Sequence, residues 1–124
     1  MKELIAVFVG GGLGSLLRFG LGRWFGAASG HTFPIGTFAV NILACFMLGL
    51  IVGLADQKQM LSPFTRLFWA VGFCGGFSTF STFSLENLQF MQTGQFSIML
   101  LYIGLSFLVC LAATFTGQYL AIRM

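Results

Sequence analysis

The chain has very little charge. Only 7% of its 124 residues are Asp, Glu, Lys or Arg, whereas 57% are hydrophobic. This composition leaves too little polar surface to cover a globule in water, so it excludes a soluble domain, and we expect no nucleic-acid partner. Proline is also scarce, and its two copies lie between the long apolar runs. The sequence therefore predicts an all-α integral membrane protein.

Residues that bind metals or form disulfides are equally scarce. The three cysteines, Cys45, Cys74 and Cys110, lie in three different apolar runs without paired spacing, and the single histidine, His31, lies in a loop. This pattern fits neither a disulfide framework nor a clustered metal site. We expect the cysteines to be small buried residues and His31 to be solvated or interfacial. So few titratable groups also supply a proton relay poorly.

Four apolar runs between the charges are long enough to span a bilayer. We expect membrane-spanning helices at about residues 4–25, 35–54, 64–90 and 96–122. These helices use most of the chain, so residues 1–124 are expected to form a single four-helix domain with short loops. The first run is not expected to be a signal peptide, because glycines interrupt it and it continues to residue 25.

The basic residues show only a weak preference for one side of the membrane. Four predicted spans place Lys2, Lys58, Arg66 and Arg123 on one side, and Arg18 and Arg23 toward the other. A bias this weak permits insertion in both orientations and therefore an antiparallel homodimer, although a single orientation with cytoplasmic termini is also compatible. Four packed helices normally fill their own centre, so a pore made by one copy is not expected.

Small residues recur at four-residue spacing, which lets helix backbones approach closely. We expect most of these pairs to pack helices together within one copy of the chain. The pairs are Gly10 and Gly14, Gly49 and Gly53, and Gly72 and Gly76. The cluster at residues 10–14 is not a dinucleotide-binding loop, because no strand precedes it and no acidic residue follows at the required distance.

The most informative segment is GFCGGFSTFSTFSLE, residues 72–86. Five of the seven residues 78–84 carry hydroxyls, and the other two are phenylalanines. We expect the third helix to be broken near Gly75, where a break frees backbone carbonyls that are ready ligands for a cation. The alternative is a continuous and tightly packed helix, since glycine is common in membrane spans.

Helical spacing divides the hydroxyl run into two faces. If residues 78–84 are helical, Phe80 and Phe83 lie about 60° apart and form a ridge. The hydroxyls spread over the other side, with Glu86 on the stripe of Thr79 and Thr82. The alternative is that the hydroxyls bond to carbonyls of the preceding turn while the phenylalanines face lipid.

Three other runs add polar residues. Thr37 and Asn41 are one helical turn apart, as are Tyr102 and Ser106. An asparagine inside a membrane either bonds to a neighbouring helix or lines a wet site. Arg18 either extends to the interface as an anchor or makes a pore mouth attractive to anions. Hydroxyls, an amide and aromatic edges suit a small anion, so these residues indicate a pathway for a small polar solute or anion.

Residues 72–86, together with GxxxR at residues 14–18 and GTFAVNILACFMLG at residues 36–49, resemble the Fluc or CrcB family of fluoride channels. The similarity covers nearly the whole chain. It implies a channel and not an enzyme, acting in the bacterial inner membrane as a dual-topology, antiparallel homodimer. It further implies passive, fluoride-selective export through two pathways and a structural sodium ion on the dimer axis.

The resemblance also assigns residues to these roles. It implies that the backbone carbonyls of Gly75 and Ser78 from both subunits hold the sodium ion. With Ser106 added from its spacing, the expected fluoride pathway comprises Asn41, Phe80, Ser81, Thr82, Phe83, Tyr102 and Ser106. The residues expected at the vestibule or in its support are Arg18, Thr37 and Glu86.

Two other classes of protein compete with this interpretation. A small multidrug exporter has a similar size and dual topology, but it needs a glutamate within the first span, where this chain has only Arg18. A non-transporting assembly subunit explains the packing glycines but leaves the hydroxyl run without a role.

Overall fold

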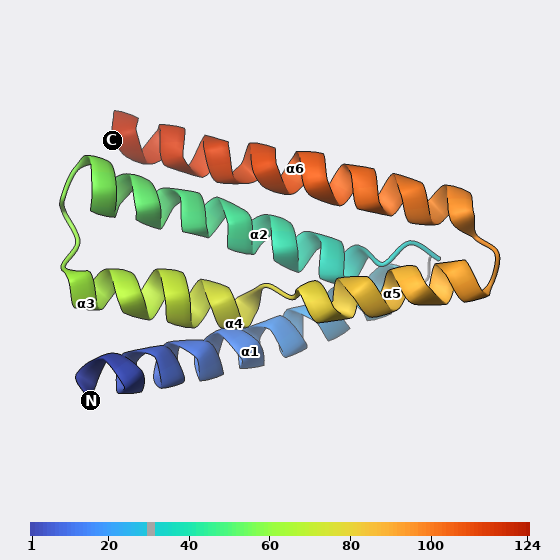
Figure 1. Cartoon of the computed structure of the whole chain (residues 1–124), viewed down its shortest axis with the longest axis horizontal. Helices are drawn as coiled ribbons and strands as arrows, with labels where there is room; N and C mark the ends of the chain where they lie inside the picture. The colour runs from blue at the N-terminus through green and yellow to red at the C-terminus, as the bar shows by residue number, and fades with distance from the viewer. Residues whose placement is uncertain (30–31) are drawn as a thin grey trace.

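The computed structural model describes residues 1–29 and 32–124, so His31 lies outside the described residues. All regular structure in these residues is helical, which confirms the all-α part of the predicted fold. Both termini lie at the same end of the molecule (Figure 1). In chain order the elements are α1 (Lys2–Ser29), α2 (Ile35–Val52), the π-helical η1 (Gly53–Gln57), α3 (Pro63–Arg66), the π-helical η2 (Leu67–Cys74), α4 (Gly75–Phe77), α5 (Phe80–Gln92) and α6 (Phe96–Arg123).

Three helices in the described part of the chain are long and apolar enough to cross a membrane: Lys2–Ala27, Ile35–Gln57 and Phe96–Arg123. Residues 64–90, predicted as the remaining span, are built instead from α3, η2, α4 and α5, which follow one another in a row (Figure 1). Of these, η2 and α4 contact α2, whereas α5 contacts α6. Helix α1 continues beyond its predicted end at residue 25 to Ser29. No proline interrupts the chain before Pro34, so nothing forces an earlier end.

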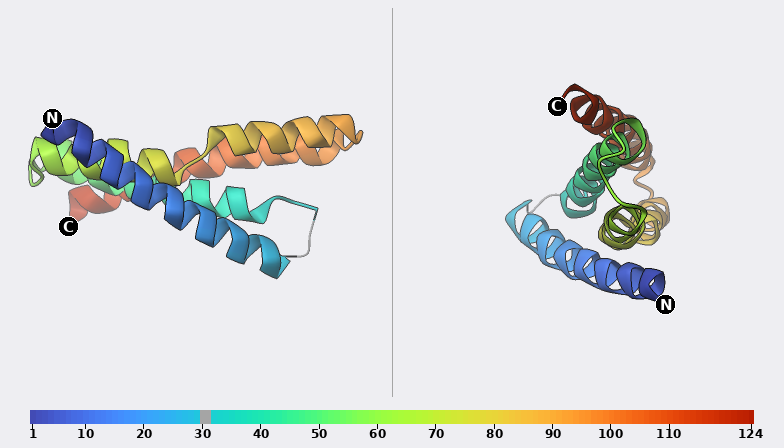
Figure 2. Two further views of the ribbon diagram at one scale, coloured as in Figure 1. Left: turned by 90° about the horizontal axis from the view of Figure 1, so that it is seen from below. Right: turned by 90° about the vertical axis from the view of Figure 1, so that its left-hand side faces the viewer.

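Helix α1 packs obliquely across η2 and α4 through glycines on both sides (Figure 2). A Cβ atom on Gly10 would lie 2.6 Å from the carbonyl oxygen of Phe68. A Cβ atom on Gly14 would overlap the carbonyl of Phe73, and one on Gly76 would overlap that of Gly11. Because any larger side chain would separate the backbones, these glycines act within one copy of the chain, as predicted.

Helices α2 and α6 run in the same direction side by side (Figure 1). A Cβ atom on Gly49 would overlap the carbonyl of Thr114, and one on Gly53 would lie 3.0 Å from that of Gln118. Residues four positions apart lie on the same face of a helix. A residue four, eight or twelve positions before Gly49 on α2 is therefore expected to face the residue at the same distance before Thr114 on α6. The pairs are Cys45 with Cys110, Asn41 with Ser106, and Thr37 with Tyr102.

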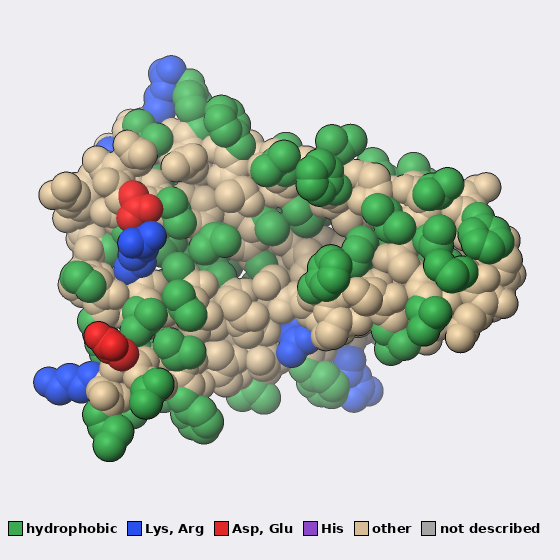
Figure 3. All heavy atoms as spheres, viewed as in Figure 1, with side chains coloured by type: hydrophobic (Ala, Val, Ile, Leu, Met, Phe, Trp, Pro, Cys, Tyr) green, Lys and Arg blue, Asp and Glu red, His purple; other side chains and the backbone are tan. Residues whose placement is uncertain are grey.

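The buried core is small and central. Val40, Ala44 and Phe77 form its centre, and Phe73 and Met47 pack against it. The outer surface carries many exposed hydrophobic side chains, while the acidic side chains visible in Figure 3 lie toward the end that holds the termini. A protein in water does not expose so much apolar area, so these faces suit contact with lipid or with another membrane protein.

Candidate functional site

The row of helices from α3 to α5 is interrupted at Ser78 and Thr79. Helix α4 ends at Phe77, and the backbone is then extended, with ψ of 158° at Ser78 and 116° at Thr79, before α5 begins at Phe80. Gly75 is itself helical, with φ of −63° and ψ of −38°. The sequence predicted an interruption near Gly75. The interruption lies C-terminal to that residue, so it does not depend on the conformational freedom of the glycine.

Asn41 on α2 holds the interrupted backbone in place. Its Oδ1 accepts a hydrogen bond from the Thr79 amide at 2.8 Å, and its Nδ2 donates to the Thr79 carbonyl oxygen at 3.1 Å. Thr79 is buried, so without Asn41 both of its peptide groups would lack these partners at membrane depth. A side chain on a neighbouring helix thus replaces the partners that a continuous helix supplies.

The hydroxyl of Thr79 organises the start of α5. Its Oγ1 accepts a hydrogen bond from the Thr82 amide at 3.2 Å and donates to Thr82 Oγ1 at 3.0 Å, and it lies 3.3 Å from Ser81 Oγ. The first contact is an N-terminal cap of the kind that threonine makes. The hydroxyls of Thr79, Ser81 and Thr82 therefore contact one another, and that of Thr79 also accepts from the Thr82 amide. They do not bond to carbonyls of the preceding turn.

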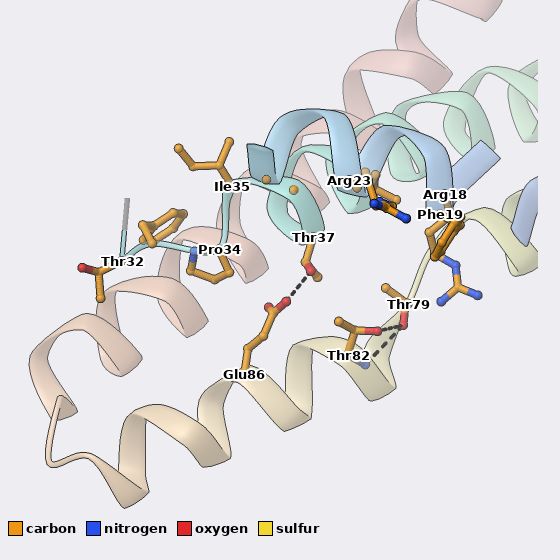
Figure 4. Close-up of a pocket in the computed structure, with 15 residues that line it drawn as sticks. Arg18, Phe19, Arg23, Thr32, Pro34, Ile35, Thr37, Thr79, Thr82 and Glu86 are labelled. Carbon is orange, nitrogen blue, oxygen red and sulfur yellow. Dashed lines mark hydrogen bonds between the residues drawn. The ribbon is translucent and has the colours of Figure 1, made fainter. Parts of the chain in front are cut away.

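A cavity of roughly 500 Å³, here called the vestibule, lies between α1, the start of α2 and α5 (Figure 4). In it, Glu86 accepts hydrogen bonds at both carboxylate oxygens, from Thr37 Oγ1 at 2.5 Å and from the Tyr102 hydroxyl at 2.7 Å. Tyr102 is fully buried. The Thr37–Tyr102 pair of the α2–α6 register thus fixes the position of Glu86.

The other side of the vestibule is lined by arginines. Arg18 and Arg23 both border the cavity, and the guanidinium of Arg23 lies 5.6 Å from the ring centre of Phe19. The Nε atom of Arg18 is buried and has no hydrogen-bond partner among residues 1–29 and 32–124. Two arginines against the one carboxylate of Glu86 give the vestibule a net positive charge, which attracts anions. Arg18 thus fits the pore-mouth interpretation.

A second cavity, here called the aromatic groove, lies between α2, the interruption and α6. It is open at the surface of the protein. Asn41, Phe80, Phe83 and Ser106 border it. The ring centres of Phe80 and Phe83 are 5.6 Å apart, and Phe80 is 77% exposed. Ser106 Oγ is buried without a hydrogen-bond partner in the described part of the chain. Thr79 borders both the groove and the vestibule, so it lies between the two cavities at the interruption.

The predicted pathway residues therefore fall into separate places. Four border the groove, as described above, and Thr82 borders the vestibule. Tyr102 packs between the two, with its ring centre 4.9 Å from that of Phe83. Ser81 is exposed and borders neither cavity, but it contacts Thr79.

Three contributions were missed in the sequence. Thr79 was expected on a helical stripe, but it precedes α5 as its N-terminal cap and borders both cavities. Ser15 on α1 donates a hydrogen bond to the Gly76 carbonyl at 3.3 Å. Cys45 and Cys110 border the aromatic groove. The four-residue spacing of Asn41 from Cys45, and of Ser106 from Cys110, was the available signal for the cysteines.

Comparison with known proteins gives a consistent result. The family described as CrcB-like protein, Camphor Resistance (CrcB) matches residues 5–118. A fluoride-specific ion channel FluC of Azobacteroides pseudotrichonymphae genomovar. CFP2 is 41% identical over 120 residues, which cover 97% of this chain and 96% of the relative. The FluC protein of Flavobacterium psychrophilum is 41% identical over 98% of both chains, and that of Gloeothece citriformis is 40% identical over 99% of both.

Proposed function

The chain belongs to the CrcB-like family, and on that premise we propose that it is a fluoride-specific ion channel, a multi-pass bacterial membrane protein that exports fluoride passively. One observation carries this proposal: a positively charged vestibule and a groove lined by hydroxyls and aromatic rings lie on either side of Thr79, which borders both. A multidrug exporter is not favoured, because α1 has no acidic residue beyond its first turn.

The lining suits an anion that must lose water without being trapped. Arg18 and Arg23 raise the local concentration of anions at the vestibule. Thr79 donates its own proton to Thr82 Oγ1, so the hydroxyl hydrogen of Thr82 is free to point at an ion. Ser106 offers a further hydroxyl in the groove. Neutral donors of this kind replace hydrating water, yet bind weakly enough for the ion to leave.

The aromatic rings extend the pathway beyond the hydroxyls. Phe80 and Phe83 border the groove next to Thr79. The edge of a phenyl ring carries the positive part of its quadrupole and therefore attracts an anion. Tyr102 donates its hydroxyl hydrogen to Glu86, so we assign it to positioning Glu86 and Phe83 and not to direct contact with fluoride.

We further propose that two copies of the chain associate as an antiparallel homodimer. The aromatic groove is open along one side, and Phe80 at its rim is largely exposed. An ion crossing the bilayer needs this open side to be covered by protein, because lipid does not solvate charge. A second copy in the opposite orientation is compatible with the weak charge bias of the sequence.

Dual orientation is directly measurable. We expect a reporter fused to the C-terminus of the chain to be found on both sides of the membrane in comparable amounts, because the basic residues favour neither side strongly. Adding two lysines next to Lys58 should shift the reporter toward one side, and adding two glutamines at the same place is the matched control. Labelling of the unmodified chain on one side alone would rule out the antiparallel arrangement.

The expected sodium site fits the local backbone chemistry. In a continuous helix the amides of Thr79 and Thr82 would bond to the carbonyls of Gly75 and Ser78. Here these amides bond to Asn41 Oδ1 and Thr79 Oγ1 instead, so both carbonyls lose their usual donors. The neighbouring carbonyls of Gly76 and Thr79 accept from Ser15 and Asn41. The two carbonyls implied by the resemblance are thus available oxygen ligands, and sodium is a cation that oxygen ligands suit.

Replacing Gly75 with valine tests this site. A Cβ atom there meets nothing within 4 Å in one copy of the chain, and the backbone is helical, so the single copy should fold normally. If Gly75 faces the partner copy across a shared sodium ion, the added side chain should weaken the dimer and remove the sodium dependence of its stability. Cross-linking in liposomes with and without sodium measures both.

Gly12→Val is the matched control, because a Cβ atom at Gly12 on α1 also meets nothing within 4 Å. We expect this variant to dimerise like the parent. A Gly75→Val variant that dimerises normally and keeps its sodium dependence would show that the sodium site is misplaced.

A further inference from the structure

Two cysteines face each other beside the aromatic groove, and nothing in the proposed fluoride pathway uses them. Cys45 on α2 and Cys110 on α6 both border the groove and both are partly exposed to it. We infer that these two thiols form a binding site for a soft, two-coordinate metal cation, with mercury(II) as its best-fitting occupant.

The α2–α6 register brings the two thiols together. One turn toward the C-termini, Gly49 and Thr114 are so close that no Cβ atom fits on the glycine. One turn toward the N-termini, Asn41 and Ser106 border the same groove. The cysteines lie between these two contacts, on the same faces of two parallel helices, and both border the aromatic groove.

The ligand set selects the class of metal. Thiolates are soft ligands, which favour soft metal ions over sodium, magnesium or calcium. Zinc prefers four protein ligands in a structural site, and no group of three or more His, Cys, Asp or Glu able to hold a metal occurs in the described part of the chain. Mercury(II), by contrast, forms stable linear complexes with two thiolate ligands.

Charge balance favours mercury(II) over a monovalent soft cation. Binding breaks two S–H bonds, forms two Hg–S bonds and releases two protons, without any oxidant or reductant. The product has no net charge, whereas silver(I) with two thiolates carries one negative charge. A net charge is costly between membrane helices, so the neutral product is the more stable one there.

The position of the site gives it a consequence for transport. A metal bridging Cys45 and Cys110 occupies the wall of the groove one turn from Asn41 and Ser106. The bound metal links α2 to α6 and narrows the aromatic groove next to Phe80 and Phe83. On the proposed function of the chain, bound mercury(II) should therefore slow fluoride efflux.

Binding of mercuric chloride to the purified chain in nanodiscs tests the site without any transport measurement. Native mass spectrometry should show one mercury atom per chain. In Cys45→Ser and Cys110→Ser the second thiolate is missing, so the affinity for mercury should fall roughly a hundredfold or more, the usual gain from linking two ligands. Cys74→Ala is the matched control, because Cys74 is buried and does not border the groove. It should bind mercury like the parent.

Fluoride efflux from liposomes gives the second readout. Mercuric chloride should slow efflux through the parent and through Cys74→Ala, and dithiothreitol should restore it. Unchanged binding in Cys110→Ser, or loss of binding in Cys74→Ala, would overturn the site. Mercury that binds the parent without slowing its efflux would overturn the placement of the site beside the conducting path. If the parent chain conducts no fluoride at all, the proposed function is wrong. The mercury-binding measurement tests the metal site in either case.

Discussion

Replacing Asn41 with aspartate should stop fluoride conduction. Aspartate keeps an acceptor for the Thr79 amide but loses the Nδ2 donor that the Thr79 carbonyl uses at 3.1 Å. It also places a negative charge on the wall of the groove. With an effective dielectric constant of about 20, a like charge about 4 Å from a passing anion costs about 4 kcal/mol. A barrier raised by that amount lowers the rate about a thousandfold.

Fluoride-selective electrodes on liposomes that contain the purified variant measure this loss. Gln92→Glu is the matched control, because it adds the same charge by the same chemical change at an exposed position at the end of α5. This control should conduct like the parent. Conduction by Asn41→Asp at the parent rate would mean that fluoride does not pass beside Asn41.

Replacing both Phe80 and Phe83 with isoleucine should cut fluoride flux while the protein remains folded. The rings border the groove, and isoleucine roughly keeps their apolar character but has no positively polarised edge. If each edge contributes about 1 kcal/mol, which is the scale of aromatic pair energies, the pair is worth about 2 kcal/mol. Flux through the double variant should then fall roughly thirtyfold. Phe80 is largely exposed in one copy, so its replacement should cost that copy little stability.

Phe8→Ile separates the pathway from a general effect of losing an exposed ring. Phe8 on α1 is 81% exposed, compared with 77% for Phe80, and it borders neither cavity. We expect Phe8→Ile to conduct like the parent in the same liposome assay. If the double variant also conducts like the parent, ring edges do not solvate the ion and the groove is not the path.

The helical fold was predictable because it depends on local composition. Apolar runs between sparse charges predicted three of the helices within a few residues, and the glycine spacing predicted close helix packing within one copy, although not which helices meet. The π-helical segments η1 and η2 were not predicted, since no local pattern of residues distinguishes them from α-helix.

The position of the interruption was not predictable from local sequence. Glycine weakens a helix, which favoured a break near Gly75, but Gly75 is helical. The chain leaves the helix at Ser78 and Thr79, where Asn41 on another helix offers both a donor and an acceptor to the backbone. That contact joins residues far apart in the sequence, so it depends on how α2 packs against α4.

The same limit applies to the polar residues of α2 and α6. Spacing within each helix predicted that Thr37 and Asn41 share a face, and that Tyr102 and Ser106 share another. It did not predict that the two faces meet, because this requires the parallel register set where Gly49 contacts Thr114. The hydrogen bonds of Thr37 and Tyr102 to Glu86 follow from that register.

The most direct test of the central claim is anion release from liposomes that contain the purified chain, loaded with both fluoride and chloride. After valinomycin is added to carry potassium, a fluoride-selective passive channel should release fluoride rapidly while chloride stays inside. Paired fluoride and chloride electrodes record both ions in one experiment. Fluoride release no faster than from empty liposomes, or chloride release at the same rate as fluoride, would contradict the account.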